Sequence, residues 1–251
     1  MIEKYFMPGR LFKWKLPAEA PKATDGRIID SPLNVAYAPM VNMGMDGRLY
    51  KPTTANLIAQ SRASLTMYGE VQYSWLAYAP GRTTRLSAVG DILTGPMSGC
   101  IIPVWRDEGR RYVGHVGTKD DRVIDNRVKA IFGAYMPGTT IGFNPGSGIW
   151  DNDVVKDILA KFPKLKTGKL SGFTGKEITM PAKGTWQQIA LVTTEDKCYS
   201  IMMVPLEPVC NNIWVVGGIK KVEVMDYYDL REKFLPRGRY MEGGGWVDNI
   251  K

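Results

Sequence analysis

The chain has 251 residues, of which 44% are hydrophobic and 23% charged, as is typical of a globular protein and not of a disordered one. Its formal net charge of +8 favours anionic partners on proteins, nucleic acids or membranes, but it carries no information about the fold. Three cysteines without short spacing argue against a disulfide framework, and a single histidine excludes a zinc site built from several imidazoles.

The first half of the chain is predicted to be mainly extended. Residues 1–26 are rich in Pro and Lys and lack periodicity, so we expect an extended N-terminal arm. Thr53 and Thr54 can cap a helix over residues 53–65. Runs of aromatic and β-branched residues then predict strands at 71–78, 85–89, 101–106 and 112–116.

The second half predicts two helices followed by more sheet. Helices are expected over 125–136 and over 151–162, where Asp151 can cap the chain. Strands are expected at 187–194, 199–206 and 213–224, and the glycine pair at 217–218 predicts a β-bulge. Because no regular βαβ alternation occurs, we predict one α+β domain over 1–251, a mostly antiparallel β-sandwich core flanked by helices and long loops.

Several enzyme classes are excluded by missing motifs. The chain has no Walker-type phosphate loop, no Gly-x-Gly-x-x-Gly after a strand and no Gly-x-Ser-x-Gly nucleophile elbow. Its cysteines also lack the Cys-x-x-Cys spacing of structural zinc sites. We therefore expect neither a metal site nor a nucleotide cofactor.

The segment 91–118 (DILTGPMSGCIIPVWRDEGRRYVGHVGT) places the one histidine near a cysteine. With Glu108-Gly109 as a two-residue turn, facing residues of the hairpin have numbers that sum to 217. Cys100 and His115 then lie on one face as diagonal neighbours, close enough for a thiol and an imidazole to meet. Pro103 faces Gly114 in this register, so we expect an edge strand or a bulge there.

This pair has the chemistry of a cysteine nucleophile and its base. A neighbouring imidazole can take the thiol proton, and we expect an imidazole-like or thiol-like ionisation on the acid limb of the pH profile. Gly99 leaves room for a substrate carbonyl, and backbone N–H groups near Ser98 and Gly99 can form an oxyanion hole. Thr94 can return across the intervening turn to orient the imidazole. Taken alone, each of these residues is more often structural.

The segment resembles the catalytic core of the cytotoxic necrotizing factors, dermonecrotic toxin and Burkholderia lethal factor. Their Leu-Ser-Gly-Cys motif is matched by Met97-Ser98-Gly99-Cys100, and His115 follows fifteen residues later, a spacing similar to theirs. Thr94 matches the threonine that Burkholderia lethal factor places six residues before its cysteine. The match covers roughly a tenth of the chain, and the chemotaxis receptor deamidases share the Thr, Cys and His pattern.

The resemblance implies a secreted or injected bacterial toxin or effector that acts in the host cytoplasm as a protein glutamine deamidase. Catalysis would use Cys100, His115 and Thr94 and form a thioester, and the target would be a Rho-type GTPase or a translation-initiation helicase of the host. No apolar segment of a signal peptide or a membrane span is visible in the sequence, so we expect delivery by a secretion machine or a larger toxin. We expect a monomer whose partner is the host protein and not nucleic acid.

Two alternatives use the same residues differently. A non-enzymatic basic β-protein could bind nucleic acid or an acidic partner, because aromatic and basic residues alternate at 12–15 (FKWK) and 110–115 (RRYVGH). In the other alternative, the acyl-enzyme passes to a lysine amine, which is transglutamination. Analysis of the product separates transglutamination from deamidation.

Overall fold

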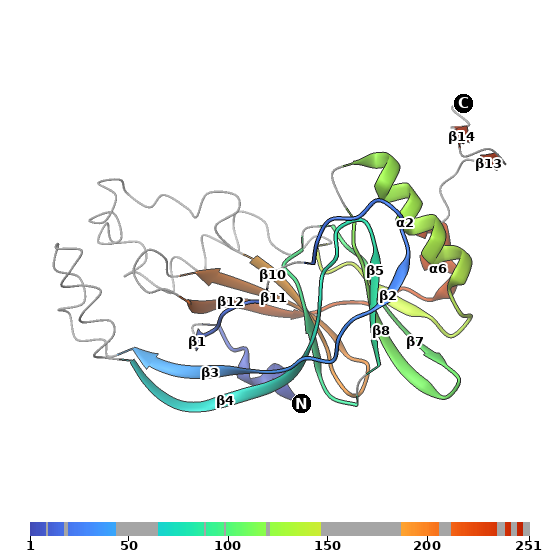
Figure 1. The fold of residues 1–251 in the computed structure, drawn as a ribbon. Helices are drawn as coiled ribbons and strands as arrows, with labels where there is room; N and C mark the ends of the chain where they lie inside the picture. The colour runs from blue at the N-terminus through green and yellow to red at the C-terminus, as the bar shows by residue number, and fades with distance from the viewer. Residues whose placement is uncertain are drawn as a thin grey trace, which may run out of the picture.

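The computed structural model of the chain contains two main sheets, which lie side by side in Figure 1. The structure describes residues 1–8, 10–17, 20–43, 65–87, 89–97, 99–118, 121–146, 187–205, 212–234, 239–241 and 245–247. The expected helices over 53–65 and 151–162 therefore lie outside the described residues, except that Leu65 begins a strand. A separate short hairpin pairs β13 (Arg239–Met241) with β14 (Gly245–Val247).

The first sheet closes into a barrel whose interior is aromatic. In order around the barrel its strands are β1 (Leu11–Lys13), β12 (Ile213–Lys221), β11 (Cys198–Pro205), β10 (Gln187–Val192), β6 (Ile92–Thr94), β4 (Leu65–Leu76) and β3 (Val35–Met43). All neighbours are antiparallel except β4 and β6. Trp14, Tyr73 and Trp75 meet edge to face inside the barrel, and the Trp14 indole donates a hydrogen bond to the Tyr73 hydroxyl.

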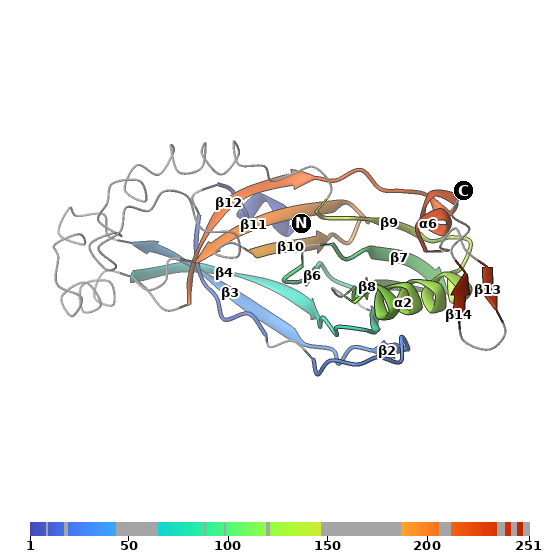
Figure 2. The same ribbon diagram turned by 90° about the horizontal axis from the view of Figure 1, so that it is seen from above.

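The second sheet has five strands and is covered by helices on its outer face. Its order is β2 (Ile28–Asp30), β5 (Thr83–Ser87), β8 (Arg110–Val116), β7 (Ile102–Asp107) and β9 (Ile141–Phe143). Helices α2 (Arg122–Tyr135) and α6 (Tyr227–Phe234) pack together against it (Figure 2). Asp121 caps α2 by accepting hydrogen bonds from the backbone N–H groups of Val123 and Ile124, so this helix begins earlier than the sequence pattern predicts.

The predicted class is confirmed, because the chain is a single α+β domain with a mostly antiparallel core. The closure of one sheet into a barrel is an addition that the sequence pattern did not reveal. The predicted bulge is also present, since Met202 pairs with Gly218 while Met203 pairs with Val216, which leaves Gly217 unpaired. No helix in the described ranges is long and apolar enough to cross a membrane.

The N-terminal segment is more than the extended arm that we expected. It contains a turn of 3-10 helix, η1 (Ile2–Tyr5), and the strand β1, which pairs with both β3 and β12 and so closes the barrel. Phe12 and Trp14 point into the barrel core, whereas Lys13 and Lys15 are exposed. Period-two alternation over only three or four residues is a weak signal, although it is the pattern of a half-buried strand.

Candidate active site

The hairpin of β7 and β8 has the register that the sequence predicts. Asp107 pairs with Arg110, and Val104 pairs with Val113, so the numbers of facing residues sum to 217. Glu108 and Gly109 have φ of 47° and 75°, as a two-residue hairpin turn with left-handed residues requires.

The edge strand or bulge expected at Pro103 is absent, because the numbers of facing residues sum to 217 on both sides of it. Pairing of β7 with β8 is interrupted between the Ile101–Val116 bridge and the Val104–Val113 pair, where Pro103 cannot donate. However, β7 is not an edge strand, because it also pairs with β9 through Pro103 and Gly142. The Ile101 carbonyl accepts from Val116 on β8, so residue 103, two positions further on, also directs its backbone groups toward β8. The missing N–H therefore weakens only the pairing with β8 and leaves the pairing with β9 intact.

Cys100 and His115 lie on the face of the second sheet that packs against the barrel. Cys100, Ile102, Val104 and Val113 belong to one core cluster with barrel residues, whereas residues with the opposite parity pack against the helices. His115 lies two positions after Val113 on β8, so its side chain is on the same face of the sheet as that of Val113. It also contacts the barrel directly, through Thr94 of β6. The predicted shared face is therefore confirmed.

Thr94 meets His115 across the junction between the two sheets. Its hydroxyl Oγ1 lies 2.7 Å from His115 Nδ1, and both residues are fully buried. Thr94 is the last residue of β6 in the barrel, and the chain then turns through Gly95, which has a φ of 155°. A Cβ on Gly95 would lie 2.9 Å from the Gln188 carbonyl oxygen, so this close turn requires glycine.

The thiol of Cys100 has a different immediate partner. Its Sγ lies 3.3 Å from Thr118 Oγ1, and only 3% of Cys100 is exposed. No hydrogen bond joins this thiol to the imidazole among the described residues, and His115 Nε2 is buried there without a hydrogen-bond partner. The structure thus places Thr94, His115 and Cys100 around one junction. The hydrogen bond between Thr94 and His115 is formed, and a hydrogen bond between Cys100 and His115 is not.

Burial keeps both members of the pair uncharged. It lowers the pKa of His115 to about 3, and it raises the pKa of the Cys100 thiol. Hydrogen bonds from Thr118 and from the Gly99 backbone oppose the shift in the thiol pKa, while the Asp125 carboxylate adds to it. The sequence predicts an imidazole-like or thiol-like ionisation on the acid limb of the pH–activity profile. Because burial lowers the pKa of His115, the imidazole of the free protein should not ionise near the ordinary pKa of histidine.

Two further side chains complete the surroundings, and sequence reasoning missed both. The Tyr78 ring stacks on the His115 ring, with centroids 4.8 Å apart and an interplanar angle of 29°. The Tyr78 hydroxyl donates a hydrogen bond of 2.9 Å to the Thr118 carbonyl oxygen. Thr118 could have been found from the sequence, because it is a hydroxyl residue only three positions after His115. Tyr78 follows β4, far away in the chain, and only the fold brings it to the site.

Of the two predicted oxyanion residues, Ser98 lies outside the described residues. Gly99 is exposed, and no described atom lies within 4 Å of the place where a Cβ on Gly99 would stand. Among the described residues, the space beside the Gly99 backbone, next to Cys100 in the chain, is therefore open.

The aromatic residues that suggested base stacking are not available for it. Phe12 and Trp14 are buried in the barrel, and Tyr112 stacks on Trp105 at 5.5 Å and lies under the Arg85 guanidinium. Arg111 forms an ion pair of 2.6 Å with Asp196. The alternation of aromatic and basic residues thus reflects half-buried strands.

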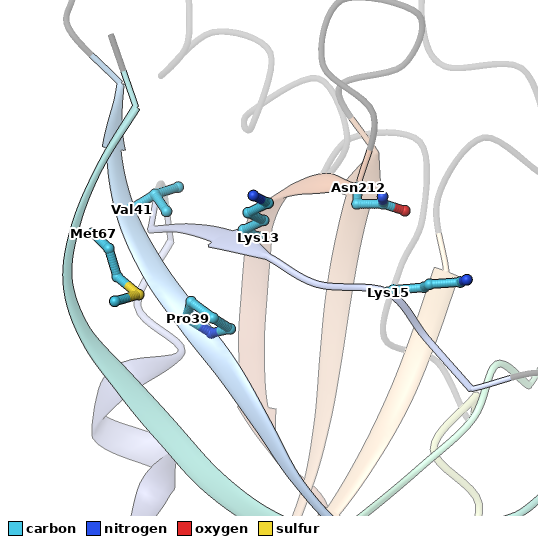
Figure 3. A pocket seen from close by; sticks show the side chains of 6 residues that line it. All are labelled: Lys13, Lys15, Pro39, Val41, Met67 and Asn212. Atoms are coloured by element: carbon cyan, nitrogen blue, oxygen red, sulfur yellow. The ribbon is translucent and has the colours of Figure 1, made fainter. Parts of the chain in front are cut away.

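A pocket of about 390 Å³ lies on another part of the molecule. Figure 3 shows it where β1 passes β3, with Lys13, Lys15, Pro39, Val41, Met67 and Asn212 as its lining. These residues include neither a cysteine nor a histidine. Among the described residues there is also no cluster of three or more His, Cys, Asp or Glu that could hold a metal ion.

Comparison of the chain with family models, with curated proteins and with solved structures finds no match in any of the three. The geometry of the Thr94, His115 and Cys100 junction and its short motif are therefore the features of this chain that point to a function.

Proposed function

We propose that the chain is a cysteine-dependent protein glutamine deamidase, with Cys100 as nucleophile and His115 as general base. The observation that carries this proposal is the 2.7 Å contact between Thr94 Oγ1 and His115 Nδ1. When Nδ1–H donates to Thr94, the other nitrogen keeps its lone pair, and Nε2 has no described partner. A base oriented on one side and free on the other is what a thiol nucleophile needs.

The proposed reaction begins from a neutral thiol and a neutral imidazole. In this mechanism the sulfur and His115 Nε2 come together when substrate binds, as catalytic hydrogen bonds that are loose in a free enzyme tighten around substrate. His115 takes the thiol proton while Sγ forms a bond to the carboxamide carbon. The resulting oxyanion is held by backbone N–H groups near Gly99 and Cys100.

The second half of the cycle returns the proton and the sulfur. His115 gives its proton to the leaving nitrogen, the C–N bond breaks and ammonia departs, which leaves a thioester on Cys100. His115 then accepts a proton from water, whose oxygen attacks the acyl carbon of the thioester. The C–S bond breaks, His115 returns the proton to the sulfur, and glutamate and the free thiol are released. The net change is hydrolysis of a carboxamide, and it requires no redox partner or metal.

The class of substrate follows from the buried thiol and from the resemblance. A carboxamide on the slender stem of glutamine can reach a thiol that is 3% exposed, past the open space beside Gly99. The resemblance to the necrotizing factors and Burkholderia lethal factor favours a folded host protein, either a Rho-type GTPase or a translation-initiation helicase. The same resemblance favours action in the host cytoplasm.

The test uses purified candidate proteins incubated with the wild-type chain or with Cys100→Ser. Deamidation releases ammonia and increases the mass of the target by the difference between a hydroxyl and an amine, and tryptic mapping identifies the glutamine. An added primary amine separates the alternative, because transglutamination attaches that amine to the target. Ammonia release that continues with Cys100→Ser would refute the proposal.

A further inference from the structure

The surroundings of the proposed couple contain a hydroxyl group and an aromatic ring that the motif does not include. Thr118 Oγ1 contacts the Cys100 sulfur at 3.3 Å, which is within the range for a hydrogen bond that involves sulfur. Of the described side chains, Thr118 is the one whose polar atom contacts this sulfur.

A thiolate at this position needs a donor because its surroundings are apolar. Cys100 belongs to a core cluster that includes Met97, Ile102 and Val104. The charged groups that act on it are few: Asp125 on α2 has the same sign as a thiolate, and His115 is neutral. A hydroxyl that donates to sulfur is therefore a major source of stabilisation for the charged form.

Tyr78 connects the two halves of the couple. One part of this side chain, its ring, stacks on His115, and the other part, its hydroxyl, donates to the Thr118 carbonyl oxygen at 2.9 Å. A single rigid side chain thus holds the imidazole and the backbone of the residue that contacts the thiol. This connection crosses from the end of β4 to the end of β8.

We propose that Thr118 is a positioning residue that donates a hydrogen bond to the Cys100 thiolate, and that Tyr78 fixes Thr118 and the His115 ring relative to each other. This inference deepens the proposed function, because it concerns the reactivity of the same thiol. Neither residue touches the carboxamide. Each acts through Cys100 or His115.

The test measures alkylation of Cys100 by iodoacetamide, whose amide group is similar in size to the end of a glutamine side chain. Labelling is followed by mass spectrometry of the tryptic fragment 86–106, which contains Cys100 and neither of the other two cysteines. The pKa of this buried thiol is raised, so the rate is measured from about pH 7 up to the highest pH at which the protein stays folded, and the thiol pKa is read from the profile.

Thr118→Val should shift the labelling profile to higher pH and slow labelling near neutral pH by about tenfold, with the high-pH plateau within about twofold of wild type. Thr118→Ser keeps the hydroxyl and should restore the wild-type profile. A defect that is only structural would change the plateau or the thermal stability and would not shift the profile. A profile that Thr118→Val leaves in place or moves to lower pH would overturn the assignment of Thr118.

Tyr78→Phe keeps the ring and removes the hydroxyl, so it should shift the profile in the same direction by a smaller amount, about threefold in rate near neutral pH. In the double variant, Tyr78→Phe should add no further shift of the labelling profile to that of Thr118→Val, because the Thr118 hydroxyl that Tyr78 positions is already absent. Full additivity would overturn the role of Tyr78.

These measurements are independent of the enzymatic proposal. If the chain deamidates no glutamine, the profile of Cys100 still reports whether Thr118 and Tyr78 tune its thiol. If native Cys100 resists alkylation at every pH while the unfolded chain reacts, the inference fails, whatever the activity.

Discussion

Two buried cysteines lie at different places in the same core cluster between the barrel and the second sheet, and their surroundings differ. Burial raises the pKa of Cys198 to about 12, and its sulfur has a backbone carbonyl, that of Asp196, as its neighbour at 3.5 Å. Cys100 is equally shielded from solvent, but it has the Thr118 hydroxyl beside it and His115 on the adjacent strand. Burial alone therefore does not decide whether a thiol is inert. The groups that can donate to it or take its proton decide that.

The largest expected contrast is between the two cysteines themselves. Cys100→Ala should abolish the proposed deamidation, whereas Cys198→Ala should keep it, because Cys100 is the nucleophile of the proposed mechanism and Cys198 has no part in it. Each change removes one buried sulfur and should lower the free energy of unfolding by a similar amount, about 1 kcal/mol. Ammonia release and urea unfolding measure the two effects. Ammonia release by Cys100→Ala, or its loss in Cys198→Ala, would show that the two thiols do not differ in the way that the proposed mechanism requires.

The base should be nearly as important as the nucleophile. His115→Ala should lower kcat/KM by about a hundredfold or more, a typical loss when a general base is removed. Thr84→Val is the matched control, because Thr84 is buried, faces His115 from β5 and donates its hydroxyl to the Ala77 carbonyl oxygen. We expect this control to stay within about threefold of wild type, since Thr84 has no chemical role. Equal losses would mean that packing and not proton transfer accounts for the effect of His115.

The buried imidazole should also make the protein sensitive to acid. Burial lowers the pKa of His115 from 6.5 to about 3 in the folded chain. Between these two pH values the unfolded chain therefore binds a proton at this imidazole and the folded chain does not. The stability of the wild type should therefore fall as the pH decreases through this window, by on the order of a few kcal/mol from this group alone. His115→Gln lacks this contribution, so the difference between the two unfolding free energies should change between pH 7 and pH 4. A difference that is constant with pH would show that His115 is not held neutral by the fold.

The smallest effect is expected from the residue that orients the base. Thr94→Val should lower kcat/KM by about tenfold, less than the loss of His115, because water or a backbone group can partly replace the hydroxyl. Thr94→Ser keeps the hydroxyl and should retain most of the activity. A loss with Thr94→Val as large as that with His115→Ala would mean that Thr94 takes part in the proton transfer itself.

The parts of this site that were predictable from sequence are those fixed by local rules. The two-residue turn at Glu108-Gly109 sets the hairpin register, and the register sets which residues share a face with Cys100. The turn after Thr94 pointed to this residue as the partner of the imidazole, the resemblance matched it, and the structure contains its contact with His115. The contacts of Tyr78 could not be predicted, because they depend on how β4 of the barrel is placed against β8 of the other sheet.

Elsewhere the sequence pattern was misleading where strands are short or contain proline. The strand β3 has Pro39 opposite Glu70 in its middle, so its propensity is poor, and pairing with β4 and β1 overrides it. Residues 12–15 alternate between buried and exposed along β1 and the two residues after it, and this alternation also has the pattern of a basic and aromatic surface. Barrel closure depends on pairing between segments that are far apart in the chain, which local periodicity does not encode.

The hydrogen bond between Thr94 and His115 joins the two sheets inside their apolar junction, whereas the Arg111–Asp196 ion pair joins them at its edge. Neither sheet alone contains a base that is oriented, so the reactive centre comes into existence only when the two halves of the domain dock. For the proposed enzyme, formation of the reactive centre and completion of folding are then one event, and a partly unfolded chain carries a thiol without an oriented base. Substitutions between the two sheets, including those far from Cys100, should lower the proposed activity gradually before they unfold the protein.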